Sequence, residues 1–190
     1  MVENVTINTD LDVDKIFKER FAASMGLDKY QTIMEQVRKT DVSKDFDFQK
    51  LFNGFYLIRR NESWRKVYYE YFESVKGDEA TFESILEYLY ETTGNIEPSF
   101  SSKMLATIFP DKPIWDKYVL QNLRLELVGK TKKERLVNAI KLYACIERWY
   151  KDFLQTEKAK ECIDVFNQNF PNYIHISNVK KIDCILWSVR

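Results

Sequence analysis

Scarcity of glycine and proline is the feature that most constrains how this chain folds. Five glycines and four prolines occur among its 190 residues. A β-sandwich or barrel needs many short strands joined by tight turns, and those turns draw heavily on both residue types. Long stretches without either residue favour helices instead. We therefore expect an all-α protein.

Apolar side chains recur every three or four residues along most of the chain, which is the spacing of one helix face. The pattern predicts about eight or nine helices. Their clearest starts are Asn61, Ser177 and a capping box of Thr131 with Glu134. The apolar face at 48–60 is too wide for a surface helix, so we expect this run in the core.

Length and the lack of internal repeats predict one all-helical domain over residues 1–190, folded as a single compact globule. Within it we expect two lobes with a cleft between them. One lobe comprises residues 10–76 and 130–190, and the other comprises residues 78–125. Hydrophobic residues make up 45% of the chain, which is enough for a core without disulfides or metal ions.

The residue counts also argue against several chemistries. His175 is the single histidine, and Cys145, Cys162 and Cys184 form no Cys-x-x-Cys pair, so we expect neither a metal site nor a cofactor. Three thiols in apolar surroundings are typical of buried free cysteines in a reducing cytosol. No apolar run is long enough to span a membrane, and the first residues are acidic rather than basic. We therefore expect a cytoplasmic protein with no membrane partner.

A formal net charge of zero conceals two halves of opposite sign. Residues 1–100 hold 13 basic and 19 acidic side chains, whereas residues 101–190 hold 16 basic and 10 acidic ones. The excess of basic residues is concentrated in 101–150, the one block whose sign suits a phosphate backbone. Solvated helix faces produce the same pattern, so the charge leaves both interpretations open.

The most specific pattern lies between Gly94 and Leu123. A proline turn leads into a short helix that we expect to begin near Ser101 or Ser102. Two further prolines then precede a helix that we expect to begin near Trp115. The motif residues are Pro98, Ser99, Phe100, Ser101, Ser102 and Lys103, followed by Pro113, Ile114, Trp115, Asp116 and Val119.

This segment resembles the helix-hairpin-helix DNA glycosylase superfamily, whose fold is that of 8-oxoguanine DNA glycosylase. In that family a Leu-Pro-Gly-x-Gly hairpin ends in a catalytic lysine, and a Pro-x-Asp turn follows the next helix. The resemblance covers about residues 80–125. Ser99 and Ser101 stand where the family has its hairpin glycines, and the linking helix is about one turn shorter.

The resemblance implies a DNA-repair enzyme, a base-excision glycosylase with AP lyase activity that acts on double-stranded DNA without a metal ion. Lys103 takes the place of the lysine that attacks the sugar C1′ of a flipped-out damaged nucleotide. Asp116 takes the place of the aspartate that stabilises the developing positive charge. From the residues alone, Lys103 could equally be an exposed lysine in a first helical turn, and Asp116 a capping carboxylate.

The residues that we expect to contact nucleic acid are three serines of the motif, four lysines and one tryptophan. They are Ser99, Ser101, Ser102, Lys112, Trp115, Lys117, Lys130 and Lys132. Lys130 and Lys132 form a basic cluster with Lys133 and Arg135 at the start of a predicted helix. Trp115 could either stack on an extruded base or fill the core.

Two other functions remain open. The first is a non-catalytic helical module that binds nucleic acid or protein, and the second, weaker one is an enzyme that acts on a small molecule through a lysine or a carboxylate. The geometry of Lys103 and Asp116 distinguishes them from the glycosylase. Convergence of both side chains on one cleft supports catalysis, whereas engagement of either elsewhere opposes it.

Overall fold

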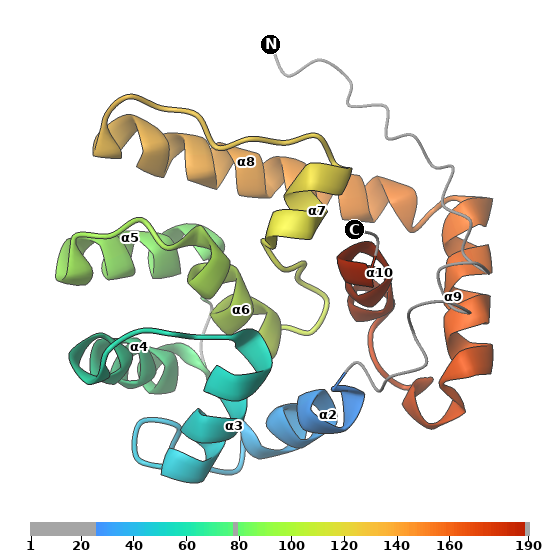
Figure 1. Cartoon of the computed structure of the whole chain (residues 1–190), viewed down its shortest axis with the longest axis horizontal. Coiled ribbons are helices and arrows are strands. Elements are labelled where there is room, and N and C mark those ends of the chain that lie inside the picture. Colours follow the sequence, from blue (N-terminus) through green and yellow to red (C-terminus); the bar gives the residue numbers. More distant parts are fainter. Residues whose placement is uncertain (1–25, 78–79, 189–190) are drawn as a thin grey trace. The chain divides into compact units, whose positions relative to one another are not determined.

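Figure 1 shows the computed structural model of the chain, which describes residues 26–77 and 80–188. Within these residues all regular structure is helical, which confirms the all-α prediction. The spacing of apolar residues also predicts a helix within residues 10–26, almost all of which lie outside the described residues. The α-helices are α2 (Leu27–Gln36), α3 (Phe46–Tyr56), α4 (Glu62–Val75), α5 (Phe82–Thr93), α6 (Pro98–Ile108), α7 (Lys117–Asn122), α8 (Lys132–Phe153), α9 (Glu157–Asn169) and α10 (Asn178–Ser188), with a short 3₁₀ turn, η1 (Pro171–Tyr173), after α9.

The chain divides into two compact units between Phe109 and Pro110. We call residues 26–109, with helices α2 to α6, the N-terminal unit. The described residues 110–188, with α7 to α10, are called the C-terminal unit. This division differs from the expected lobe limits near residues 77 and 127, because α5 packs against both α4 and α6.

The core of the N-terminal unit is a cluster of aromatic rings from α3 and α4. Phe52 is fully buried at its centre. Its ring centroid lies 4.7 Å from that of Tyr56, 5.6 Å from Phe72 and 6.0 Å from Tyr69. Aromatic pairs at such distances add about 0.5–1.5 kcal/mol each beyond the burial of their area. The expectation that the run at 48–60 lies in the core is therefore confirmed for its helical part.

The C-terminal unit is built around α8, a helix of 22 residues. Its buried side chains repeat every three or four residues and are Ala139, Tyr143, Ile146, Tyr150 and Phe153. Helix α10 packs against α7 and α9 and is buried around almost its whole circumference. The Tyr143 hydroxyl donates to the carbonyl of Pro113 at 2.8 Å, which fixes the segment before α7 to α8.

Helix starts follow the sequence signals closely. The Asn61 side chain accepts from the backbone N–H of Trp64, and Thr131 forms the expected capping box with Glu134. The Ser177 hydroxyl oxygen accepts from the backbone N–H of Lys180 at 3.1 Å. These three predictions are confirmed. Each cap satisfies a backbone N–H that has no partner inside its own helix.

Helix α6 begins at Pro98, three or four residues before the predicted start at Ser101 or Ser102. Proline suits the first helical position because its fixed φ matches the helix and its missing N–H is not needed there. The backbone N–H of Ser101 already donates to the carbonyl of Glu97 at 2.9 Å. The sequence analysis assigned Pro98 to the preceding turn, so the predicted start of α6 was wrong.

Candidate functional site

Lys103 lies in α6, half-buried, and its ammonium group is engaged within the N-terminal unit. Nζ donates to the backbone carbonyl of Tyr56 at 3.0 Å. Tyr56 is the last residue of α3, so this carbonyl is one of those left free at a helix C-terminus. A cation at this end also interacts favourably with the helix dipole. The Lys103 side chain therefore caps the C-terminus of α3.

Lys103 also belongs to a cationic and aromatic cluster at the start of α6. Its Nζ lies 5.2 Å from the centroid of the Phe100 ring, and the Arg60 guanidinium carbon lies 5.6 Å from the same centroid. Arg60 forms an ion pair with Glu97, a carboxylate that is 7% exposed. Both cations near this ring thus have partners inside the protein.

The three motif serines lie within the first turn and a half of α6 rather than in a hairpin loop. Ser101 and Ser102 are fully buried. The Ser101 hydroxyl donates to the carbonyl of Glu97 at 2.9 Å, and that of Ser102 donates to the carbonyl of Ser99 at 3.0 Å. Both hydroxyls therefore act within their own helix. None of residues 98–103 has a positive φ.

Asp116 is the N-cap of α7. Its Oδ1 accepts from the backbone N–H of Tyr118 at 2.8 Å. The side chain is half-buried in the C-terminal unit, whereas Lys103 belongs to the N-terminal unit. Both residues of the predicted catalytic pair thus bind the backbone at a helix end. Lys103 donates at the C-terminus of α3, and Asp116 accepts at the N-terminus of α7.

Two further predicted contacts, Trp115 and Lys112, are packed or paired inside the protein. Trp115 is 5% exposed, so its indole faces are packed within the protein rather than presented on the surface. Lys112 Nζ lies 2.7 Å from Glu147 Oε1 on α8, which neutralises much of its charge. Neither side chain is placed for a phosphate or a base as the structure stands.

The other three predicted contacts, Lys117, Lys130 and Lys132, are exposed on the C-terminal unit. Lys117 is the first residue of α7, and its Nζ lies 5.8 Å from the centroid of the Tyr118 ring. Lys132 is the first residue of α8, and Lys130 lies two residues before it. Lys130 and Lys132 thus lie at the start of α8, which carries a larger basic surface.

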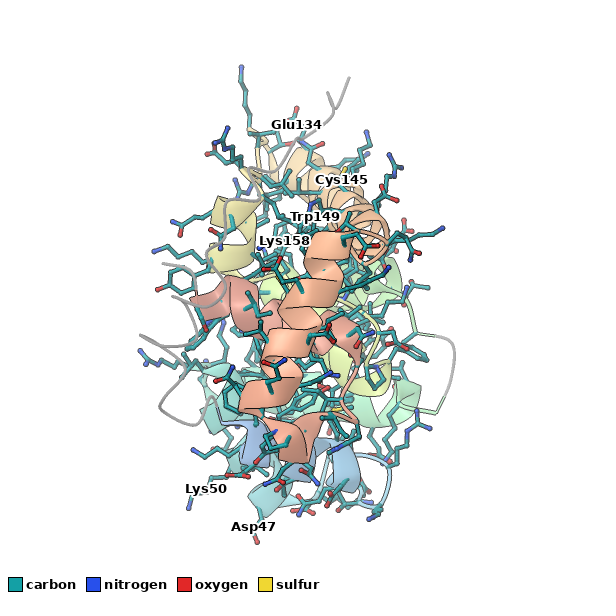
Figure 2. The ribbon with its side chains drawn as sticks, turned by 90° about the vertical axis from the view of Figure 1, so that its right-hand side faces the viewer. Asp47, Lys50, Glu134, Cys145, Trp149 and Lys158 are labelled. Atoms are coloured by element: carbon teal, nitrogen blue, oxygen red, sulfur yellow. The ribbon has the colours of Figure 1, made fainter. Side chains whose placement is uncertain are left out.

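That surface is a line of cations along the exposed side of α8, which we call the basic stripe. It consists of Lys133, Lys141, Arg148 and Lys151, all exposed and separated by eight, seven and three residues. Spacings that add in steps of three and four keep side chains on one helix face. None of the four forms an ion pair with another described residue. Figure 2 views the protein from the side of α9 and labels Glu134, Cys145 and Trp149 along α8.

The sequence analysis identified a basic cluster at residues 130–135, which includes Lys133 of the stripe. It did not identify the other three cations of the stripe. Lys141, Arg148 and Lys151 are scattered among apolar residues in the sequence. The signal that could have found them is the helical phase of α8, since its buried residues leave one open side on which these cations align.

A buried polar pair joins α8 to α10 in the C-terminal unit. The Tyr150 hydroxyl donates to Asp183 Oδ1, and both residues are buried. Burial raises the pKa of the Asp183 carboxyl to about 6, and the charge of Asp116 adds to this rise. The charge of Lys180 and hydrogen bonds from Tyr150 and from the Ile114 N–H lower the pKa and so oppose it. This carboxyl was not among the predicted site residues.

The cysteines of the chain are free. Cys162 and Cys184 are buried, and burial raises the pKa of each thiol to about 11. Cys145 is half-buried on α8. In the part of the chain that the structure describes, no three His, Cys, Asp or Glu side chains gather as they do around a metal ion.

Comparison with known proteins gives no relative. No protein family matches this chain, and no curated protein or solved structure is detectably similar to it. Among the described helices, none is both long and apolar enough to cross a membrane.

Proposed function

We propose that this chain is a non-catalytic helical module that binds the phosphate backbone of DNA through the basic stripe of α8. The observation that carries the proposal is the stripe itself. Four exposed cations lie in line, and no described acidic side chain neutralises any of them by an ion pair. From Lys133 to Lys151 the helix rises about 27 Å, or about eight base-pair steps of one DNA strand.

The contacts of Lys103 and Asp116 favour binding over catalysis. A lysine attacks a sugar only as a neutral amine with a free lone pair. Lys103 instead donates to the carbonyl of Tyr56, and Asp116 accepts at the start of α7. In these contacts Lys103 Nζ and Asp116 Oδ1 each serve a helix end, and neither contact brings the two residues together.

Binding through the stripe should be weak and sensitive to salt. Each phosphate that a cation neutralises releases counterions, so the logarithm of the association constant falls with slope of about −0.9 per contact against the logarithm of salt concentration. Four contacts give a slope of about −3.6 and an affinity typical of non-specific binding, with Kd of about 10⁻⁴–10⁻⁶ M.

Removal of the stripe tests this proposal. We expect the variant Lys133→Gln, Lys141→Gln, Arg148→Gln, Lys151→Gln to bind a labelled DNA duplex at least about tenfold more weakly at low salt, with a salt slope near zero. Fluorescence anisotropy titrations at several salt concentrations measure both the affinity and its dependence on salt. The folded structure should persist, because exposed substitutions change stability by about 0.5 kcal/mol or less.

The matched control is Lys158→Gln with Lys160→Gln on α9 of the same unit. These lysines already form ion pairs with Glu161 and Glu157 at 2.8 and 2.6 Å, so their loss should leave DNA affinity almost unchanged. If the control weakens binding about half as much as the stripe variant, in proportion to two charges removed against four, overall charge alone drives binding. No binding by the wild-type protein at low salt overturns the proposal and leaves a protein-interaction module.

The resemblance at residues 98–119 predicts a different result, excision of a damaged base, and borohydride trapping tests it. Attack by Lys103 on the sugar C1′ passes through an imine, which borohydride reduces to a covalent protein–DNA adduct. On our proposal, oligonucleotides with an intact oxidised, deaminated or alkylated base give no excision and no adduct. Excision that is lost in Lys103→Gln and strongly slowed in Asp116→Asn would instead establish the glycosylase. Circular dichroism must show that both variants remain folded, because each loses a helix-end contact.

A further inference from the structure

Helix α3 carries an exposed aromatic ring at its start. Phe46, the first residue of the helix, is 79% exposed, the largest value among the exposed large apolar side chains that the structure describes. One exposed apolar side chain is common on a protein surface and supports no conclusion by itself. Phe46, however, shares its helix face with a glycine and adjoins a pair of opposite charges, and together these features define a surface.

Gly54 lies on the same face of α3 as Phe46. Steps of four residues keep Phe46, Lys50 and Gly54 in line along the helix. The φ of Gly54 is not positive, and a Cβ at this position would meet no described atom within 4 Å. Alanine therefore fits one copy of the protein, and it is the better helix former. The glycine instead leaves the backbone of α3 open to close approach from outside.

Asp47 and Lys50 place opposite charges beside this glycine. Both side chains are exposed, and neither forms an ion pair with another described residue. Figure 2 labels both, and they point outward from α3. The acidic residue precedes the basic one by three positions. A second α3 in the parallel orientation therefore sets like charges opposite each other, whereas an antiparallel one sets each carboxylate opposite an ammonium group.

We infer that this face of α3, which consists of Phe46, Asp47, Lys50 and Gly54 and which we call the α3 face, binds the same face of a second, antiparallel copy of the chain. A two-fold axis near residue 49 brings Asp47 to within about 1.5 Å, measured along the helix, of the level of the other copy's Lys50. It brings Phe46 to within about 3 Å of the level of the other copy's Gly54. A helical side chain leans towards the N-terminus of its own helix, which for Phe46 is the direction of that glycine.

The α3 face is complementary to itself, as an interface with two-fold symmetry requires. The contact of a ring with a glycine and the contact of a carboxylate with an ammonium group each occur twice. The two Asp47 and two Lys50 side chains have a net charge of zero. One helix face from each copy buries less area than a standard interface, so we expect a weak dimer. The inference is independent of DNA binding, because α3 belongs to the N-terminal unit and the basic stripe to the C-terminal unit.

Sedimentation equilibrium of the full chain over a wide range of protein concentration tests the dimer. We expect the mass of the wild-type protein to rise from one copy to two as the concentration increases. Asp47→Lys and Lys50→Glu each set like charges opposite each other and should weaken association at least about tenfold. An equimolar mixture of the two variants should associate again, because one then carries only basic and the other only acidic side chains at these positions. Circular dichroism checks that each variant is folded.

Gly54→Ala distinguishes an interface from a structural role of the glycine. The added methyl group should raise the urea midpoint of unfolding, measured at a concentration too low for association, because alanine favours the helix. The same methyl group occupies the space for the Phe46 ring of the other copy and should weaken the dimer about tenfold. A purely structural glycine does not predict these opposite effects. The matched control is Ile174→Ala, which removes an apolar side chain that is 59% exposed on the C-terminal unit and should not change association.

Three results overturn the inference. The first is a wild-type protein with the mass of one copy at every concentration. The second is association that neither charge variant weakens, since another surface then joins the copies. The third is a mixture of the two charge variants that stays monomeric. None of these results bears on the proposed DNA binding, which the stripe variant tests separately.

Discussion

Replacement of Phe52 by alanine should lower the free energy of unfolding of the N-terminal unit by about 3–5 kcal/mol. Phe52 is fully buried and its ring contacts those of Phe48, Tyr56 and Phe72. Truncation removes the transfer free energy of the ring and leaves a cavity that rigid aromatic neighbours cannot fill. Urea unfolding followed by circular dichroism measures the loss.

The matched control for this variant is Phe46→Ala in the same helix. Phe46 is 79% exposed, so its truncation leaves no cavity and should change stability by about 0.5 kcal/mol or less. Loss of the same ring from two positions of α3 thus separates burial from helix propensity. Similar losses in both variants contradict the aromatic core described here.

Asp183 should make the stability of the C-terminal unit depend on pH. Burial raises the pKa of its carboxyl from 3.8 to about 6 in the folded protein. Below pH 3.8 both the folded and the unfolded state hold the proton, and the stability is greatest there with respect to this group. As the pH rises from 3.8 to 6, the unfolded chain releases the proton first and folding is progressively disfavoured. Each pKa unit corresponds to 1.36 kcal/mol, so the total loss is about 3 kcal/mol.

Asp183→Asn cannot titrate and should lose this pH dependence. The difference between the unfolding free energies of the wild-type protein and the variant should therefore fall by about 2.4 kcal/mol between pH 4 and pH 7. Tyr150→Phe removes a hydrogen bond that lowers the pKa of Asp183, so the loss should then extend to higher pH. Denaturant titrations at each pH measure the free energy of unfolding of the wild-type protein, of Asp183→Asn and of Tyr150→Phe.

Asp41 provides a control of opposite sign. A hydrogen bond from Lys44, with others from Ser43, lowers the pKa of the Asp41 carboxyl from 3.8 to about 2. Its contribution to stability is present above pH 3.8 and is lost as the pH falls towards 2. Asp41→Asn should therefore leave the slope between pH 5 and pH 7 unchanged. If the difference in unfolding free energy between the wild-type protein and Asp183→Asn does not change with pH, the Asp183 carboxyl is not buried in solution.

Local signals in the sequence predicted local structure well. Thr131 and Glu134 are three residues apart, and a capping box needs nothing beyond that spacing. The wide apolar face at 48–60 likewise indicated burial, because a face of that width cannot be left in water at low cost. Pro98 was misassigned because proline begins turns and helices alike, and the choice depends on how the following residues pack.

The contacts of the candidate site depend on residues far apart in the chain, which a single sequence does not pair. Lys103 donates to a carbonyl 47 residues earlier, and nothing in the residues around either one signals this bond. Trp115 and Trp187 both lie among apolar residues in the sequence, yet one is 5% and the other 40% exposed. The tertiary structure, and not the local sequence, distinguishes them.

The placement of the three thiols has a practical consequence for spectroscopy. Maleimide reagents attack thiolates, and Cys162 and Cys184 are both buried and protonated at neutral pH. Cys145 is the least buried of the three and lies one helical turn from both Lys141 and Arg148. The natural chain thus offers one attachment point for a fluorophore or spin label, directly beside the basic stripe, without removal of any cysteine.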